Sequence, residues 1–143
     1  MNQFQYKAFL SKLSNKPDID YIISVHNKLN SLTNPIDKAF SFYFFNKALK
    51  AKYQNAKEDV KFYFCSTRIQ FIRSINLSYS LFFNDERLLS FYKNNQDCLE
   101  LFIETMQEEG HDYDYMMCLH STIIEFSNNQ NIINAANELL ESA

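Results

Sequence analysis

Residues 58–84 contain neither glycine nor proline, and they are dense in aromatic and branched side chains. Placed on a helix of about 3.6 residues per turn, their apolar side chains form one broad face. That face would carry Val60, Phe64, Phe71, Ile75, Tyr79 and Phe82, widened by Ile69, Ile72 and Phe83. A face of this width suits a helix that is buried on more than one side. The stretch therefore predicts a long helix at the centre of a helical domain.

The same stretch also allows a β interpretation. Between residues 69 and 81, apolar and polar side chains alternate except around Arg73, as they would in a half-buried strand. Strands are typically only about 5 to 6 residues long, however. A hairpin would also need Gly, Asn-Gly or Asp-Gly at its turn, and this stretch has none of them. We therefore favour the helix, and the alternative is an α+β fold with strands within residues 60–82.

Residues that form tight turns are scarce in the whole chain, which has one glycine and two prolines among 143 residues. Few positions can adopt a positive φ, which disfavours β-sandwiches, barrels and glycine-rich phosphate loops. A chain of this length corresponds to one domain, which would bury roughly two thirds of the surface exposed when unfolded. We predict an all-α fold, with residues 1–143 forming a single-domain helical bundle or a short α-solenoid of about seven helices.

Several residues indicate where these helices begin and end. Asp18 and Asn34 are suited to cap the start of a helix, and Pro35 fits a first turn. Asn84-Asp85-Glu86 offers a further cap, and another helix is expected to begin at His111-Asp112. Gly110 resembles the residue that ends a helix, so the helix that starts near Leu99 is expected to continue as far as Gly110.

The charges of the chain divide at residue 73. Residues 1–73 carry 12 Lys and Arg against 5 Asp and Glu, which gives +7, whereas residues 74–143 carry 2 against 12, which gives −10. The total of −3 hides this separation. A surface with charges of one sign attracts oppositely charged partners and raises their rate of association. The division is therefore the main functional lead in the sequence.

The acidic half contains carboxylates at helical spacing. Side chains three or four residues apart share one face of a helix. Such a stripe would consist of Asp97, Glu100, Glu104 and Glu108, extended past Gly110 by Asp112 and Asp114 with Tyr113 and Tyr115 alternating between them. Tyrosine beside charge is a common anchor in protein interfaces. We predict that these eight residues form a docking face, although a merely solvated outer face would show the same pattern.

The partner predicted for this face is a basic protein. A toxin, a nuclease or another nucleic-acid-binding protein has a positive site that carboxylates could cover in place of phosphates. The sequence therefore favours a small inhibitor of the immunity type. The alternative is a helical adaptor or regulatory protein whose partner is unrelated to nucleic acid.

The basic half allows a third interpretation, in which lysines bind nucleic acid. Its lysines are interleaved with aromatic side chains that could stack on bases. They are Lys47, Lys50, Lys52, Lys57 and Lys61, with Tyr53, Phe62 and Tyr63 among them. Nucleic-acid-binding domains are usually basic overall, whereas this chain has a pI near 5.6. Binding of nucleic acid is therefore the weaker prediction.

No catalytic or metal-binding motif stands out. Glu108 and His111 have the spacing of a di-iron ligand pair, but there is no second such pair and Gly110 would interrupt the helix between them. Cys118 and His120 are two residues apart and would point to different sides of a helix. We expect no enzymatic activity, no catalytic residue, no cofactor and no metal.

The cysteines and the hydropathy favour a soluble protein in the cytoplasm. Cys65, Cys98 and Cys118 are odd in number and form no C-x-x-C pair, so reduced and mostly buried thiols are expected. The first residues show no signal peptide. The uncharged run of residues 74–84 is well short of the ~20 residues that span a bilayer. We therefore expect no membrane partner.

Overall fold

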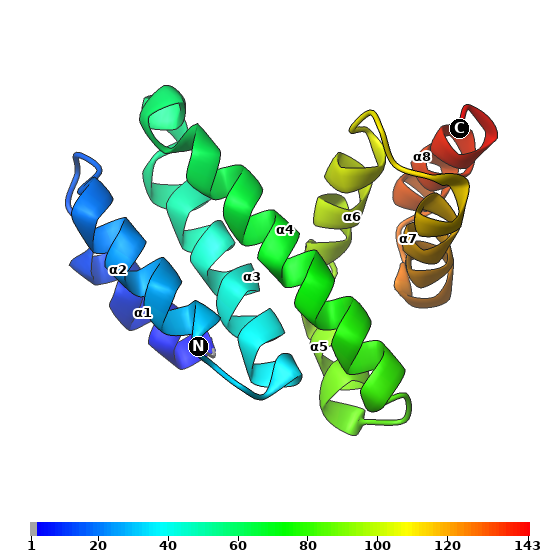
Figure 1. Ribbon diagram of the computed structural model, residues 1–143, viewed down its shortest axis with the longest axis horizontal. Coiled ribbons are helices and arrows are strands. Elements are labelled where there is room, and N and C mark those ends of the chain that lie inside the picture. Colours follow the sequence, from blue (N-terminus) through cyan, green and yellow to red (C-terminus); the bar gives the residue numbers. More distant parts are fainter. Residues whose placement is uncertain (1–2) are drawn as a thin grey trace. The chain divides into compact units, whose positions relative to one another are not determined.

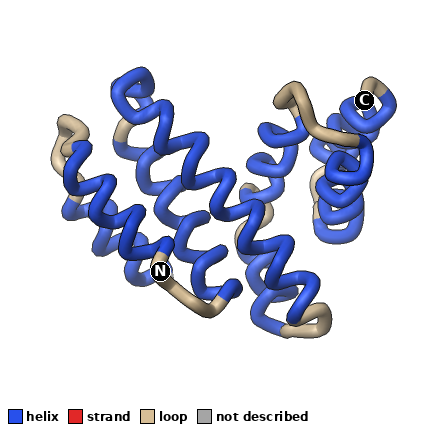
Figure 2. Tube along the Cα trace, viewed as in Figure 1, coloured by secondary structure: helices blue, strands red, loops and turns tan. Residues whose placement is uncertain are grey.

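The protein is helical throughout its described length (Figure 1). The computed structural model describes residues 3–143 and their side chains from Gln5 onward. Over this range it contains eight α-helices and one short 3-10 helix, and no strand (Figure 2). The α-helices are α1 (Gln3–Lys12), α2 (Ile19–Asn30), α3 (Pro35–Lys52), α4 (Lys57–Leu81), α5 (Glu86–Asn94), α6 (Cys98–Met106), α7 (Tyr113–Phe126) and α8 (Gln130–Glu141). The all-α prediction is confirmed, with eight helices where about seven were expected.

The contacts within the chain define two compact units. The N-terminal unit ends at Phe83 and the C-terminal unit is Asn84–Ala143. The helices α1 to α4 belong to the first unit and α5 to α8 to the second. That residues 1–143 form a single domain stays a prediction.

The α+β alternative for residues 60–82 is wrong. Val60 to Leu81 lie within α4, and the N–H of Phe82 bonds to the carbonyl of Ser78 at 2.7 Å to close the last turn. The alternation of residues 69–81 therefore has no structural counterpart. The absence of turn residues inside the stretch is the feature that decides the outcome, because nothing in it can reverse the chain.

The centre of the N-terminal unit is α3 rather than α4. Helix α3 packs along α4 and also contacts α1 and α2 (Figure 1). As a result α3 is buried nearly all round, and Phe42, Phe45, Ala48 and Leu49 are completely inaccessible. A helix with apolar residues on every side is typical of a core surrounded by other helices.

Two polar links fix the positions of elements around α3. The amide Nδ2 of buried Asn46 donates to the carbonyl of Phe64 at 3.1 Å and to Oγ1 of Thr67 at 2.9 Å, which joins α3 to α4. The hydroxyl of Tyr53 donates to the carbonyl of Ser14 at 2.8 Å and joins the end of α3 to the segment after α1. Buried polar groups that are satisfied in this way stabilise one arrangement over others.

The predicted helix starts are confirmed. Asp18 Oδ1 accepts from the N–H of Tyr21 at 3.2 Å, and Asn34 Oδ1 accepts from the N–H of Ile36 at 2.9 Å, with Pro35 in the first turn. Each cap satisfies an N–H that has no partner within its helix. The caps that begin α5 and α7 follow the same pattern, with Asp85 Oδ1 accepting from the N–H of Arg87 at 2.7 Å.

The predicted end of α6 is wrong. The helix ends at Met106 with Gln107 as its C-cap, and Gly110 lies in the connection to α7. Gly110 has φ = +91°, and among the described residues it is the glycine at which the chain uses a positive φ to turn. The residues between Met106 and Gly110 are therefore not part of a helix.

The C-terminal unit is held together by aromatic and amide contacts. The rings of Tyr92 on α5 and Phe126 on α7 stack with centroids 4.1 Å apart. Gln96 Nε2 donates to the carbonyls of Tyr92 and Phe126, both at 2.8 Å, and Gln96 Oε1 accepts from the N–H of Asn128 at 2.9 Å. Helices α6, α7 and α8 pack on one another. Gln96 thus fixes the end of α5 against the end of α7.

None of the described helices is both long enough and apolar enough to cross a bilayer.

Candidate functional site

The boundary between the compact units coincides with the division of charge. Residues 74–83 carry no charge, so the N-terminal unit has 12 − 5 = +7 and the C-terminal unit has 2 − 12 = −10. The acidic residues are thus properties of one compact body rather than of an arbitrary half of the sequence. A field of this sign around one unit attracts cations and repels phosphates.

Helix α6 carries the first part of the predicted acidic surface. Most of its sides are buried, whereas Asp97 at its N-cap and Glu100 in its first turn are exposed. Glu104 is only half-buried, one turn further along. The carboxylates therefore occupy a narrow strip on the one side of α6 that is not packed.

Glu108 does not continue this strip on the same helix, which corrects the predicted continuous stripe over residues 97–108. Because α6 ends at Met106, Glu108 lies in the connection, where its Oε2 is 3.5 Å from Nε2 of His111. The ring of His111 is 4.9 Å from the ring of Tyr115. Glu108 and Tyr115 thus belong to a small cluster around His111.

The other predicted residues lie at the start of α7 and have different roles. Asp112 is the N-cap, and its Oδ1 accepts from the N–H of Tyr115 at 2.7 Å. Asp114 and Tyr113 are exposed, and 55% of Tyr113 is accessible. Tyr115 is half-buried. Asp112 therefore stabilises the helix, and Asp114 and Tyr113 remain available for contact with a partner.

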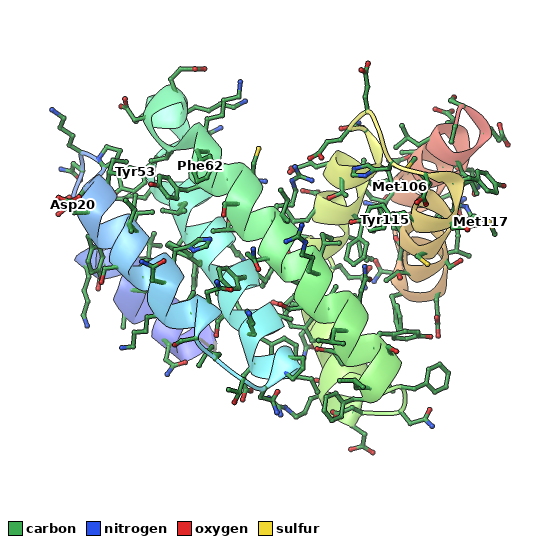
Figure 3. All side chains as sticks on the ribbon, viewed as in Figure 1. Asp20, Tyr53, Phe62, Met106, Tyr115 and Met117 are labelled. Carbon is green, nitrogen blue, oxygen red and sulfur yellow. The ribbon has the colours of Figure 1, made fainter. Side chains whose placement is uncertain are left out.

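The sequence-based prediction missed an apolar row on the outer side of α7. Besides Tyr113, this helix exposes 43% of Met117 and 42% of Ile124. Figure 3 shows Met117 and Tyr115 on opposite sides of the helix. Asp114 and Glu125 are the carboxylates exposed near the two ends of this row. We call Tyr113, Met117 and Ile124 the α7 row.

The α7 row could have been predicted from the spacing of its residues. Tyr113, Met117 and Ile124 are four and seven residues apart in the sequence, so they share one face of a helix. Exposed apolar side chains grouped on one helix face are typical of a protein-binding surface, whereas scattered ones are ordinary.

Histidines and cysteines in the described residues do not gather into a metal-binding group. No group of three or more His, Cys, Asp or Glu side chains in that part of the chain could hold a metal ion. His120 Nε2 is 2.8 Å from Asn137 Oδ1, which links α7 to α8. Burial raises the pKa of the Cys98 thiol, with a smaller contribution from Asp97. The expectation of mostly buried thiols is wrong for Cys65 and Cys118, which are both exposed.

His26 is the half-buried histidine of the N-terminal unit. Its ring lies 5.2 Å from that of Phe42, and its Nε2 is 2.8 Å from Ser66 Oγ. Burial lowers the pKa of His26 from its ordinary value of 6.5, because the imidazolium loses its hydration.

This lowered pKa predicts a loss of stability in acid. When the pH falls through the ordinary pKa of histidine, about 6.5, the unfolded chain takes up a proton that folded His26 does not. The free energy of unfolding should therefore decrease from about pH 7 to about pH 5, and less so in His26→Gln. Urea unfolding of both proteins at the two pH values measures the difference. An equal decrease in wild type and His26→Gln would contradict the prediction.

No protein-family model matches the chain, and comparisons with curated proteins and with solved structures found no match.

Proposed function

We propose that this chain is a small protein-binding inhibitor of the immunity type, which neutralises a basic protein through the C-terminal unit. The observation that supports this best is that the C-terminal unit combines negative charge with exposed apolar side chains. The unit carries a net charge of −10, and its helix α7 exposes the α7 row with carboxylates near both ends. Negative charge beside exposed apolar side chains is a composition suited to binding a basic protein.

The carboxylates of the C-terminal unit and the α7 row have separate roles in binding. The carboxylates attract the basic partner over a distance and repel competing nucleic acid. The α7 row then supplies the apolar contact that excludes water, with Tyr113 as a rigid anchor and Met117 as an adaptable one. If the partner is a nuclease or a toxin that binds nucleic acid, Glu100 and Asp114 occupy the positions that phosphates would take.

The burial of the acidic residues decides which of them can test the proposal. Glu104 is half-buried and Glu108 contacts His111, so lysine at either position would also disturb the fold. Glu100 and Asp114 are exposed. Glu138 and Glu141 on α8 are also exposed and belong to the same unit. Replacing Glu138 and Glu141 by lysine therefore serves as a control with an identical change of charge.

The experiment is a pull-down with three tagged baits from lysate of the protein's own source. The baits are wild type, the double variant Glu100→Lys with Asp114→Lys, and the control Glu138→Lys with Glu141→Lys. We expect wild type and control to recover one strongly basic protein at low salt, and the Glu100/Asp114 variant to recover roughly ten times less of it. Quantitative mass spectrometry measures the recovery, and high salt should reduce it for every bait because the charges are then screened.

Different results would separate the alternatives. Equal recovery by all three baits would rule out the surface around Glu100 and Asp114. Recovery that disappears after nuclease treatment would show that the chain binds nucleic acid through its lysines. The isolated partner is then assayed for cleavage or binding of nucleic acid. An activity that an equimolar amount of the chain leaves unchanged would favour an adaptor over an inhibitor.

A further inference from the structure

A pocket lies between the end of α3 and the start of α4, within the N-terminal unit. Its volume is about 430 Å³, and the described residues that line it are Lys50, Ala51, Gln54, Lys57 and Phe64. Pockets that hold small ligands have volumes of roughly 300 to 1,000 Å³. The space is thus adequate for one small molecule.

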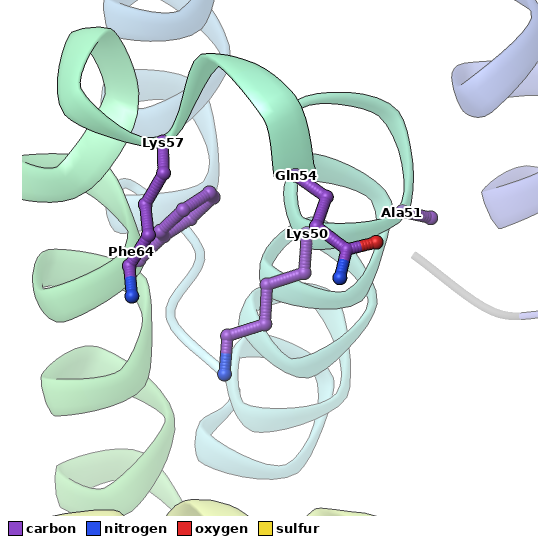
Figure 4. A pocket seen from close by; sticks show the side chains of 5 residues that line it. All are labelled: Lys50, Ala51, Gln54, Lys57 and Phe64. Atoms are coloured by element: carbon purple, nitrogen blue, oxygen red, sulfur yellow. The ribbon is translucent and has the colours of Figure 1, made fainter.

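The walls of the pocket carry complementary chemistry. Figure 4 shows Lys57 and Phe64 on α4, with Lys50 and Gln54 across the space from them. The two lysines thus approach from different walls, and none of the described lining residues carries a carboxylate. The pocket combines two ammonium groups, one amide and one aromatic ring.

The backbone around the pocket is fixed by the packing of the unit. Asn46 on α3 donates to the carbonyl of Phe64 at 3.1 Å, which holds this turn of α4 against α3. Tyr53, between the two helices, is buried and its hydroxyl donates to the carbonyl of Ser14. The positions from which Lys50, Lys57 and Phe64 extend are therefore set before any ligand binds, and such preorganisation favours binding.

We propose that this pocket binds a planar ring that carries a phosphate, as found in a nucleoside monophosphate unit. The phosphate lies between the ammonium groups of Lys50 and Lys57, which act as point charges. The ring stacks on Phe64. The amide of Gln54 donates to or accepts from the edge of the ring, since it can do both. The unit is either a free nucleotide or part of a single strand, and both present the same chemistry.

The proposal is tested by titrating the whole ¹⁵N-labelled chain with AMP, GMP, CMP and UMP, with inorganic phosphate alone, and with a short single-stranded RNA. We expect amide shifts to concentrate in residues 50–64 for at least one nucleotide or for the RNA. Lys50→Gln and Lys57→Gln should each weaken binding by about tenfold, since each removes a charged contact. Phe64→Leu should weaken it by about fivefold, since it removes the stacking face.

The matched control is Lys61→Gln. Lys61 is exposed one turn beyond Lys57 on α4 and is not among the pocket residues, so its replacement changes the charge equally without touching the pocket. Its affinity should stay near that of wild type. Thermal unfolding followed by circular dichroism shows that each variant is folded, and the exposed Lys57 keeps the test available if Phe64→Leu unfolds.

The absence of saturable shifts with every nucleotide and with the RNA would overturn the proposal. An equal loss of affinity in Lys61→Gln and Lys57→Gln would also overturn it, since it would indicate diffuse attraction to the basic unit. Inorganic phosphate that binds as tightly as the nucleotides would overturn it too, since it would exclude stacking on Phe64. If the RNA binds more tightly than every mononucleotide with the same dependence on the variants, the ligand is part of a strand. The opposite order identifies a free nucleotide.

Discussion

Replacing Phe45 by alanine should lower the free energy of unfolding by about 3 to 5 kcal/mol. Phe45 is completely buried on α3, and its ring lies 5.5 Å from that of Phe9 on α1 and 6.5 Å from that of His26 on α2. Three helices therefore meet at this one side chain. Alanine removes the contacts and leaves a cavity that none of the helices can fill by moving alone. Urea unfolding followed by far-UV circular dichroism measures the loss.

The matched control is Phe62→Ala, which removes the same side chain from the surface. Phe62 is 72% exposed on α4, so its loss should change the free energy of unfolding by at most about 0.5 kcal/mol. Equal costs for the two variants would show that α3 is not the centre of the N-terminal unit.

Hydrogen exchange in Phe45→Ala also tests the single-domain prediction. A single cooperative domain requires residues on both sides of Phe83 to lose protection together.

The helix starts could be predicted from the sequence because they are local. A capping carboxylate or amide needs only the N–H groups two or three residues after it, as at Asp18, Asn34 and Asp112. The long helix α4 followed from a similar local fact, the absence of turn residues.

The central position of α3 and the end of α6 depend on more than local sequence. Helix α3 has apolar side chains on every side. Only the packing of α1, α2 and α4 against it shows that all of these sides are buried. Gln107, Glu108 and Glu109 are all compatible with a helix, so nothing in their residue types ends α6 at Met106. The prediction for Glu108 depended on a helix that continued through these residues.

The sequence predicted only part of the candidate surface, because burial and capping also depend on how the helices pack. Asp97 and Glu100 are both exposed at the start of α6. The capping role of Asp112 and the partial burial of Tyr115 reduce the number of residues available to a partner. The pocket at Lys50 and Phe64 was not predictable, because it forms only where two helices lie side by side.

The two sides of α7 give the last prediction, which separates packing from binding. Leu119 is completely inaccessible on the side that includes Met116 and Ile123. Leu119→Ala should lower the free energy of unfolding by about 2 to 5 kcal/mol, because it leaves a cavity in the C-terminal unit. Met117 lies two residues away on the outer side, and Met117→Ala should change the same quantity by at most about 0.5 kcal/mol. Urea unfolding measures both.

The pull-down described above should rank these two variants in the opposite order. Met117→Ala removes an apolar contact from the α7 row and should lower recovery of the basic partner, with little effect on folding. Leu119→Ala keeps the whole row, so the fraction of the protein that remains folded should bind as wild type does. A Met117→Ala bait that recovers as much partner as wild type would exclude the α7 row as the apolar part of the interface. The acidic residues would then be the sole basis for the proposed function.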